Sequence, residues 1–438
     1  MNHQLDLTRR AIDRRNFLKA AGAGLAASAL PALPVFGQEK VKLLLWSWLP
    51  DFQTQVDMFT AAHPDIEVEL VNAGQGGPQY ANLRAGLAAG SGLPDVVHME
   101  FQHINSFKQN DAFLDIGQWA NAHKDKFPAG SWNQVSEGDA VYAMPWDSGP
   151  MALLYRTDIL EKHGIAVPTT WAEFAEAAVK LHETDPNVFM TNATFTDGGW
   201  TNALLWQAGW RPVTRNGTEL TIKINDQVAK DFAKYWQDLL DTGAIEAKPG
   251  FTTEWYSGLD QGRYATWIAA GWGPVFLSGV AANSSGQWRA SDIPQWQAGD
   301  FVTSNWGGST LAVMKTTQHP AEAAELAIWL TTNPEATALY TTKQFLFPTL
   351  SALLESPDYA GQKSDFYGGQ PVNEVFAKSA QAVDLGFEWS PFQDYLYQAM
   401  SDEFGAALGG NGTLSDAFDR IQASVVTFAQ DQGFTVVE

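Results

Sequence analysis

Three carboxylates, Glu100, Asp147 and Asp197, each stand in a short segment that contains Gly, Ser or Gln. Carboxylates in such a solvated, hydrogen-bonding setting are expected to stay ionised and to accept hydrogen bonds from the hydroxyl groups of a ligand. Cleavage of a glycosidic bond would instead need two carboxyl groups about 5 to 10 Å apart, one of them kept protonated by a less polar setting. The spacing of residues along the chain does not give that separation, so binding and hydrolysis both stay open at this point.

Tryptophan is the second residue type that could carry function, since the chain has 18 of them. Many large aromatic side chains indicate either bulky cores or a cleft that stacks planar or sugar-like ligands. Trp171 and Trp236 stand at helical spacing from other apolar residues and are predicted to be core side chains. Trp272 lies between Gly271 and Gly273, has little local packing, and is therefore expected to be exposed in a cleft.

Sequence patterns for other chemistries are missing. The chain has no phosphate-binding loop of the GxxxxGKS or GxxxxGKT type, no HExxH and no GxSxG. It has no cysteine, which excludes disulfides and thiolate metal sites. His98 and His103 are too far apart in the predicted elements and lack a third ligand nearby, so no metal site and no cofactor are predicted.

Residues 1–37 have the features of an export signal. The stretch Arg14-Arg-Asn-Phe-Leu-Lys is a twin-arginine pattern, followed by the weakly apolar run Ala20–Ala32 and the small-residue site Val35–Gly37. The run is too short to cross a bilayer, which needs about 20 apolar residues. Asp13 stands where twin-arginine signals usually carry Ser or Thr, so the export route stays open while export to the periplasm is expected.

The net charge of the chain limits the classes of ligand that it can bind, and its length indicates the number of domains. The full chain of 438 residues has a net charge of −22, and the leader contributes five Lys or Arg and two Asp, so the remaining chain carries about −25. Such an acidic chain is not expected to bind nucleic acid or an anionic lipid surface. Roughly 400 residues exceed what one core usually holds, and two domains are therefore expected.

The first part of the chain after the leader alternates between strand and helix patterns. Strands are predicted at residues 41–46, 66–71 and 94–99, with helices at residues 52–62 and 80–89 between them. This order predicts parallel strands, and ligands bind beyond the carboxyl ends of such strands. The segments that follow the three strands contain the candidate side chains Trp48, Asp51, Gln75, Glu100 and Gln102.

The stretch from Tyr142 to Arg156 is predicted to connect two domains. Met151–Tyr155 is an apolar run typical of a strand buried on both faces. Gly149 and Pro150 make a poor strand centre, because proline lacks the N–H donor that a ladder needs. We therefore expect one domain to end there, with Asp147 facing a gap between two lobes; an ordinary loop between a helix and a strand is the alternative.

Four stretches spread over most of the chain resemble the bacterial extracellular solute-binding proteins of family 1, the maltose-binding-protein-like sugar-binding components of ABC transporters. They are Leu93-Pro-Asp-Val-Val; Met144-Pro-Trp-Asp-Ser-Gly with Leu154-Tyr-Arg-Thr-Asp-Ile-Leu and Pro168-Thr-Thr-Trp; Gly307-Gly-Ser-Thr-Leu-Ala-Val with His319-Pro-Ala-Glu; and residues 410–422. The family usually has Tyr-Asn where this chain has Tyr155-Arg156, a position that supports a strand.

The resemblance implies an α/β fold of two lobes, each a largely parallel sheet flanked by helices, joined by crossing hinge segments. It implies an N-terminal lobe of residues 38–149 plus 300–348 and a C-terminal lobe of residues 150–299 plus 349–438. A sugar would be held between the lobes, and their closure would signal to an ABC transporter permease in the inner membrane. A protein that docks to a permease in this way is expected to be a monomer and not an enzyme.

By position, the resemblance implies a set of ligand-binding residues that agrees with the strand-end argument. The set is Trp48, Asp51, Gln75, Glu100, Gln102, Asp147, Asp197, Trp200, Trp272, Trp306, Glu388 and Trp389. Indole faces cover the apolar C–H face of a pyranose, each contributing about 1 kcal/mol beyond the area that it buries. Several such indoles imply a di- or oligosaccharide or a glycoside, whereas Trp146 and Trp206 are expected in the core.

Two other functions stay open. The first is an exported glycoside hydrolase with a Trp-lined cleft. The second is the binding of another solute, such as a polyamine, a peptide or an acidic sugar; the acidic loops favour a cation over an anion, while Arg211, Arg263 and Lys343 remain single contacts for an acidic sugar.

Overall fold

The computed structural model describes residues 40–216, 219–343 and 346–437. The predicted export signal, residues 1–37, lies outside the described residues. Residues Lys40–Glu438 form one unit of contacting elements. Within the described ranges, every helix is too short or too polar to cross a membrane.

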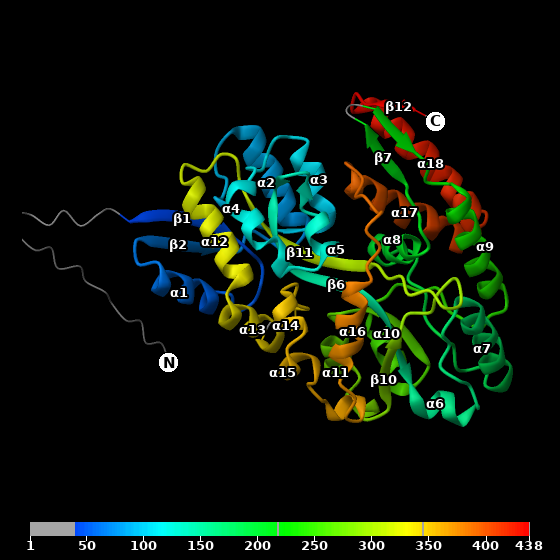
Figure 1. The fold of residues 1–438 in the computed structure, drawn as a ribbon. Helices are drawn as coiled ribbons and strands as arrows, with labels where there is room; N and C mark the ends of the chain where they lie inside the picture. The colour runs from blue at the N-terminus through cyan, green and yellow to red at the C-terminus, as the bar shows by residue number, and fades with distance from the viewer. Residues whose placement is uncertain (1–39, 217–218, 344–345, 438) are drawn as a thin grey trace, which may run out of the picture. The chain divides into compact units, whose positions relative to one another are not determined.

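One large sheet organises these residues (Figure 1). Its strands are β1 (Val41–Trp46), β2 (Ile66–Val71), β3 (Val96–Glu100), β6 (Ala143–Arg156), β9 (Thr266–Ala270), β10 (Trp288–Asp292) and β11 (Asn305–Val313). The strand order is β10-β6-β11-β3-β1-β2, and β9 also pairs with β6. Strand β1 pairs in parallel with β2 and β3, as the alternation of strands and helices predicts. The other ladders of this sheet are antiparallel.

Strand β6 runs through Gly149 and Pro150 without a break, so the prediction that these two residues make a poor strand centre is wrong. What changes there is the partner: β6 pairs with β11 as far as Pro150, and with β9 and β10 from Met151 onward. Pro150 stands opposite Asn305, the first residue of β11, where a missing N–H donor costs least. A Cβ on Gly149 would lie 1.9 Å from the carbonyl oxygen of Trp306, so the crossing needs glycine.

Helices surround the two parts of the sheet (Figure 1). Around β1, β2 and β3 they are α1 (Gln53–Ala62), α2 (Gly77–Ala89), α3 (Phe101–Lys108), α4 (Gly117–Ala120), α12 (Pro320–Thr332) and α13 (Pro334–Lys343). Helix α5 (Ala129–Asn133) packs beside β6. The other helices are α6 (Thr157–Lys162), α7 (Trp171–Thr184), α8 (Gly198–Gln207), α9 (Gln227–Asp241), α10 (Thr253–Gln261), α11 (Gly273–Val280), α14 (Ser351–Leu354), α15 (Pro357–Ala360), α16 (Val372–Gln381), α17 (Gln393–Leu408) and α18 (Leu414–Asp431). Two small sheets consist of β4 (Ser136–Glu137) with β5 (Ala140–Val141), and of β7 (Val213–Asn216), β8 (Glu219–Ile222) and β12 (Thr435–Val437).

Tryptophan-rich packing fills the core beside α7, α8 and α9. Trp171 and Trp236 are buried with ring centroids 5.6 Å apart, which confirms both as core residues. Thr170 is the N-cap residue of α7, and its side chain accepts a hydrogen bond from the Glu173 N–H in a capping box. The core positions predicted for Trp146 and Trp206 are also confirmed, since both side chains are buried.

Candidate ligand-binding site

Three strands bring two of the predicted carboxylates into one row. Ser309 of β11 pairs with Glu100, the last residue of β3, on one side and with Asp147 of β6 on the other. Because neighbouring strands lie about 4.8 Å apart, the backbones of Glu100 and Asp147 are about 10 Å apart across Ser309. Residues that pair directly in this way point to the same face of the sheet. The pairing thus places Glu100, at the end of β3, and Asp147 of β6 in one row across Ser309.

Asp147 is buried, with 5% of its surface exposed, and its Oδ1 atom has no hydrogen-bond partner among the described residues. Burial raises the pKa of Asp147 to about 7, against the hydrogen bonds from the hydroxyl and N–H groups of Ser309, while the charge of Glu100 raises it further. The expectation of a solvated, fully ionised Asp147 is wrong, because β6 lies inside the sheet at this point and is not a loop.

The pKa of Glu100 shifts in the opposite direction to that of Asp147. The Tyr80 hydroxyl donates to Glu100 Oε2 at 2.9 Å, and His103 Nε2 lies 3.5 Å from the same oxygen. Burial acts to raise the pKa of Glu100, but the hydrogen bond and charge of His103 and the hydroxyl of Tyr80 together hold it below its ordinary value. The row therefore joins an ionised carboxylate to one that can keep its proton near neutral pH.

Asp197 reaches this region from the start of α8. As the N-cap residue of that helix, it accepts a hydrogen bond from the Trp200 N–H at 3.0 Å, and the Trp306 side chain also hydrogen-bonds to it. Burial raises its pKa in spite of these bonds, and the charge of Glu100 raises it further. We call Glu100, Asp147, Asp197, Trp306 and Ser309 the strand-end cluster.

Aromatic rings pack beside Trp306. Trp272 lies with its ring centroid 4.8 Å from that of Trp306 and donates its indole N–H to the Trp306 carbonyl at 3.1 Å. Phe251 lies within 6.0 Å of both rings. Trp306 is 6% exposed and Trp272 is half-buried, so the exposure expected for Trp272 is only partial. The reason is that tertiary packing supplies the neighbours that its flanking glycines lack.

Trp48, which follows β1, is held in place by His98. The two rings are stacked with centroids 3.9 Å apart, and Tyr80 meets the Trp48 ring edge-on at 6.0 Å. Burial lowers the pKa of His98 to about 3, so its imidazole is neutral, and Ser47 Oγ lies 3.1 Å from His98 Nδ1. The neutral His98 ring thus supports the half-buried indole of Trp48.

A group of polar side chains links α2, α3 and α17 next to Glu100. Asp394 of α17 pairs with Arg84 of α2 and with His103 of α3. Burial acts to lower the pKa of His103, but Asp394 and Glu100 raise it to about 9. Burial raises the pKa of Tyr397, and the charges of Asp197, Glu100 and Asp394 raise it further, so this phenol lies among three carboxylates.

The remaining predicted residues lie in several places. Asp51 and Gln75 are exposed in the segments after β1 and β2, and Gln102 is buried in the first turn of α3 with its Oε1 unpartnered among the described residues. Trp200 is 1% exposed, donates its indole N–H to the Ile268 carbonyl at 3.2 Å, and packs against Trp236. It therefore lies inside the core and not at the strand-end cluster.

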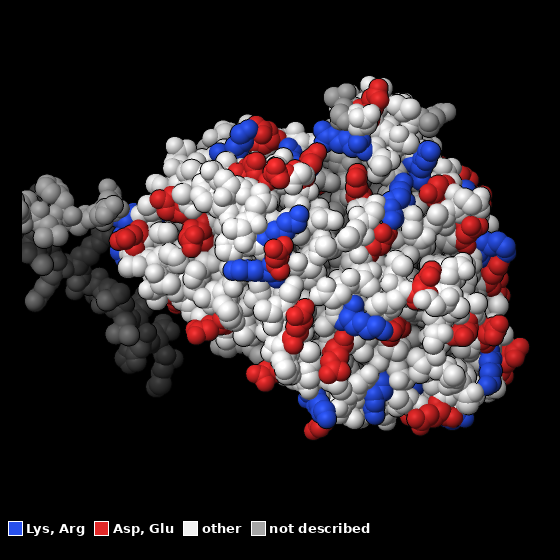
Figure 2. All heavy atoms as spheres, in the orientation of Figure 1, with Lys and Arg blue, Asp and Glu red and all other residues white. Residues whose placement is uncertain are grey.

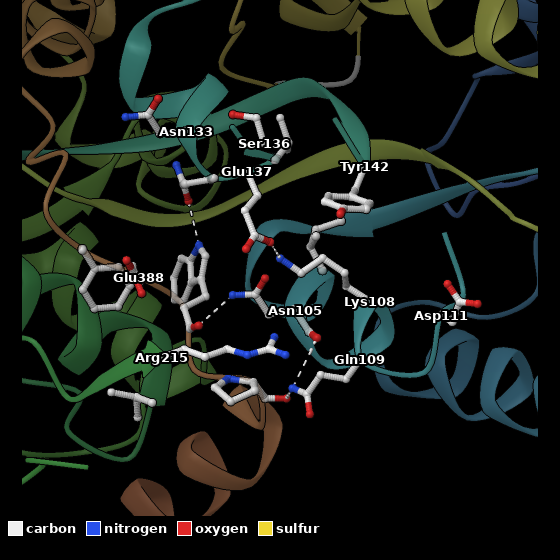
Figure 3. Close-up of a pocket in the computed structure, with 17 residues that line it drawn as sticks. Asn105, Lys108, Gln109, Asp111, Asn133, Ser136, Glu137, Tyr142, Arg215 and Glu388 are labelled. Atoms are coloured by element: carbon white, nitrogen blue, oxygen red, sulfur yellow. Dashed lines mark hydrogen bonds and ion pairs between the residues drawn. The ribbon is translucent and has the colours of Figure 1, made fainter. Parts of the chain in front are cut away.

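Glu388 and Trp389 lie elsewhere, in the lining of a pocket of about 650 Å³ (Figure 3). This pocket also takes lining residues from α3, from the β4–β5 hairpin and from β7. Trp389 donates its indole N–H to Gln134 Oε1 at 2.9 Å, so it is fixed to the segment after α5. The structure thus separates these two residues from the row of Glu100, Ser309 and Asp147.

Five residues of this region were not predicted as site residues from the sequence: Tyr80, Arg84, His103, Asp394 and Tyr397. One signal was available: Tyr80 lies in the first turn of the helix that follows the second strand, at the edge of the sheet where ligands bind. Asp394 and Tyr397 carry no such signal, because they meet Glu100 only through the tertiary packing of α17 on α3. Across residues 40–216, 219–343 and 346–437, no group of His, Cys, Asp or Glu has the arrangement needed to hold a metal ion.

Comparison with known proteins gives a consistent family. A family model described as bacterial extracellular solute-binding protein matches residues 46–337. The lactose-binding protein of Rhizobium radiobacter is 24% identical over 421 residues, which cover 90% of this chain and 94% of that protein.

Solved structures with the same fold are also similar to this chain. The ABC transporter associated binding protein from Bifidobacterium animalis subsp. lactis Bl-04, in complex with β-1,6-galactobiose, is 29% identical with a TM-score of 0.77, covering 91% of this chain and 100% of that one. The galacto-N-biose-/lacto-N-biose I-binding protein from Bifidobacterium longum has a TM-score of 0.80 at 23% identity, covering 91% and 99%. These structures are two-lobed binding proteins, which is the predicted fold class.

Proposed function

This chain belongs to the family of bacterial extracellular solute-binding proteins, and from that premise we propose that it binds a carbohydrate and delivers it to an ABC importer. The names of its relatives support the ligand class, since they state lactose, β-1,6-galactobiose and lacto-N-biose as their ligands. The observation that carries the proposal is the row of Glu100, Ser309 and Asp147 beside Asp197 and Trp306.

The chemistry of this row suits sugar hydroxyl groups. Ionised Glu100 accepts hydrogen bonds, while Asp147, with a pKa of about 7, can accept or donate. Trp306, Trp272 and Trp48 supply indole faces for the apolar face of a pyranose ring. Asp51, Gln75 and Gln102 complete the proposed set from the neighbouring strand ends. We assign the ligand as a di- or oligosaccharide or a glycoside.

We place the border between two lobes where β6 changes its partner, at Pro150. The proposed N-terminal lobe is residues 38–149 plus 300–348, and the proposed C-terminal lobe is residues 150–299 plus 349–438. Glu100 and Asp147 belong to the first lobe and Asp197 and Trp272 to the second. A sugar that contacts both lobes favours their closure by its higher affinity for the closed state.

Export through the leader of residues 1–37 would place the protein in the periplasm, where it would act as a monomer on a permease of the inner membrane. Lys and Arg side chains are interspersed with Asp and Glu on the face shown in Figure 2. The net charge of −22 argues against nucleic acid as a ligand.

Glycoside hydrolysis remains a second candidate because of one observation. The pKa of Asp147 is raised to about 7 while that of Glu100 is lowered, and glycosidases use such a split between an acid and a base. Release of galactose from lactose, measured over hours at micromolar protein, distinguishes the two. We expect no release of galactose. Release that is lost in the Asp147→Asn variant would show that the protein is a glycoside hydrolase and would overturn the proposed binding function.

Titration calorimetry of the protein without residues 1–37 tests the proposal. The ligands are lactose, β-1,6-galactobiose and lacto-N-biose, with spermidine and a tripeptide as controls. We expect saturable binding of at least one disaccharide. Binding of spermidine or the peptide alone would overturn the carbohydrate assignment and leave the family assignment in place.

A further inference from the structure

The pocket in Figure 3 is a feature that the proposed function does not use. Helix α3 contributes Asn105 and Lys108, and Gln109 is the C-cap residue of that helix. Strand β4 contributes Glu137, and β7 contributes Arg215. The segment Phe387–Pro391 forms a further wall. In the view of Figure 3, the Lys108–Glu137 ion pair and Arg215 lie on opposite sides of Asn105. Its volume of about 650 Å³ is within the range of small-molecule sites.

Hydrogen bonds fix the wall formed by residues 387–391. Asn105 Nδ2 donates to the Trp389 carbonyl at 2.7 Å, and Gln109 Nε2 donates to the Pro391 carbonyl at 2.9 Å. Both carboxamides therefore have their oxygens left as acceptors, with no donor to them among the described residues. The pocket walls are preformed, so a ligand would not have to order them.

The charges that line the pocket largely cancel. Lys108 lies 2.8 Å from Glu137 and 5.1 Å from the ring centre of Tyr142. Asp111 pairs with Lys315 outside the lining. Arg215 and Glu388 then carry opposite charges, which leaves no excess that would select an anion or a cation.

The uncharged groups of the lining match a polyhydroxylated molecule. Amide oxygens of Asn105 and Gln109 accept hydrogen bonds, and the Tyr142 hydroxyl and the Asn133 amide, neither bonded to another described residue through its side chain, can donate. The rings of Tyr142 and Trp389 add aromatic surface. We propose that this pocket is a second binding site for a neutral carbohydrate, separate from the strand-end cluster. The inference rests on the proposed function for its ligand class only.

Calorimetric titration with lactose at millimolar concentrations, on the chain without residues 1–37, tests the second site. Asn133→Trp fills the pocket from an exposed position at the end of α5, and Asn411→Trp adds the same ring at an exposed position outside the lining. Trp272→Ala is expected to weaken carbohydrate binding at the strand-end cluster, and Trp272 does not line the pocket. We expect two sites in the unmodified chain, with the weaker one lowered at least tenfold by Asn133→Trp and unchanged by Asn411→Trp.

The outcomes separate this inference from the proposed function. If the Trp272→Ala variant still binds lactose at the weaker site, the second binding site is supported. A single site that Trp272→Ala weakens and Asn133→Trp leaves unchanged would overturn the second site and keep the proposed function. Weak binding that only Asn133→Trp removes, with no stronger site for any sugar, would support the pocket and overturn the strand-end assignment. Absence of any binding would overturn both.

Discussion

Asp147 combines deep burial with a proton that it holds near neutral pH. Its pKa is raised to about 7 by burial, while in the unfolded chain it would titrate near its ordinary value of 3.8. Between these two values the folded chain binds a proton that the unfolded chain has lost. The stabilisation from Asp147 is therefore present at low pH and disappears as the pH rises through 7.

Asp147→Asn should remove this pH dependence. At pH 8 the variant is expected to be more stable than the unmodified chain by roughly 2–4 kcal/mol, because no charge is buried, and at pH 4 the two should be alike. Urea unfolding of both chains at pH 4, 6 and 8 measures the difference. A constant difference at all three values would mean that Asp147 is ionised throughout.

Trp272 and Trp200 offer a matched pair of substitutions. Trp272→Ala should weaken carbohydrate binding by more than tenfold and lower the Tm of the empty protein by only a few degrees, since Trp272 is half-buried. Trp200→Ala should lower stability by about 3–5 kcal/mol, because that side chain is 1% exposed in the core. Calorimetry measures the ligand affinity of both variants, and thermal unfolding measures their stability. Unchanged affinity in Trp272→Ala would mean that Trp272 contributes to packing alone.

For single residues, the sequence predicts the element on which a side chain lies better than it predicts whether that side chain is buried. The position of Glu100 at the end of β3 follows from the strand pattern, and the burial of Trp171 and Trp236 follows from helical spacing. The burial of Asp147 could not be predicted, because it depends on β11 lying between β3 and β6. The burial of Trp200 depends on Trp236, 36 positions later in the sequence.

At the level of the elements, the close approach of β6 and β11 at Gly149 leaves no space for a larger side chain. Gly149→Ala should lower the free energy of unfolding by several kcal/mol or prevent folding, since its Cβ would lie 1.9 Å from the Trp306 carbonyl oxygen. Gly279→Ala in α11 is the control: no atom lies within 4 Å of its Cβ, and alanine favours a helix by about 1 kcal/mol. Urea unfolding of both variants tests this; equal stabilities would mean that β6 shifts to make room.

The contact between α3 and α17 is expected to respond to pH. Asp394 and Glu100 raise the pKa of His103 to about 9 against the effect of burial, so the stabilisation is complete below about 6.5 and is lost as the pH rises through 9. Asp394→Asn should lower stability at pH 7 by about 1 kcal/mol and move this loss to lower pH. Thermal unfolding between pH 6 and 10 measures both effects.

Asp238→Asn provides the comparison for that measurement, because Asp238 pairs with Lys234 on the exposed surface of α9. It should change stability little at any pH in this range. If Asp394→Asn behaves in the same way, the bridge between α3 and α17 contributes nothing to the fold.

Local patterns predicted most of the elements near the chain start. Strands β1, β2 and β3 lie where the sequence predicts them, with ends that differ by at most two residues. The passage of β6 through Gly149 and Pro150 was missed, since their strand-breaking character is a local property and the close approach of Trp306 is not.

For the molecule as a whole, the proposed closure predicts a smaller radius of gyration with ligand than without it. Small-angle X-ray scattering of the empty protein and of the protein saturated with the best disaccharide measures the change. Trp272→Ala at the same ligand concentration should scatter like the empty protein. An unchanged radius on saturation would mean that binding occurs without lobe movement.

The position of β11 between β3 and β6 also sets an order of events during synthesis. A nascent chain that ends before Asn305 contains both β3 and β6 but not the strand that joins them. Each then has an open edge that invites pairing with another chain. The first part of the protein therefore cannot complete its sheet on the ribosome until most of the sequence has emerged, and it depends until then on a chaperone or on rapid completion.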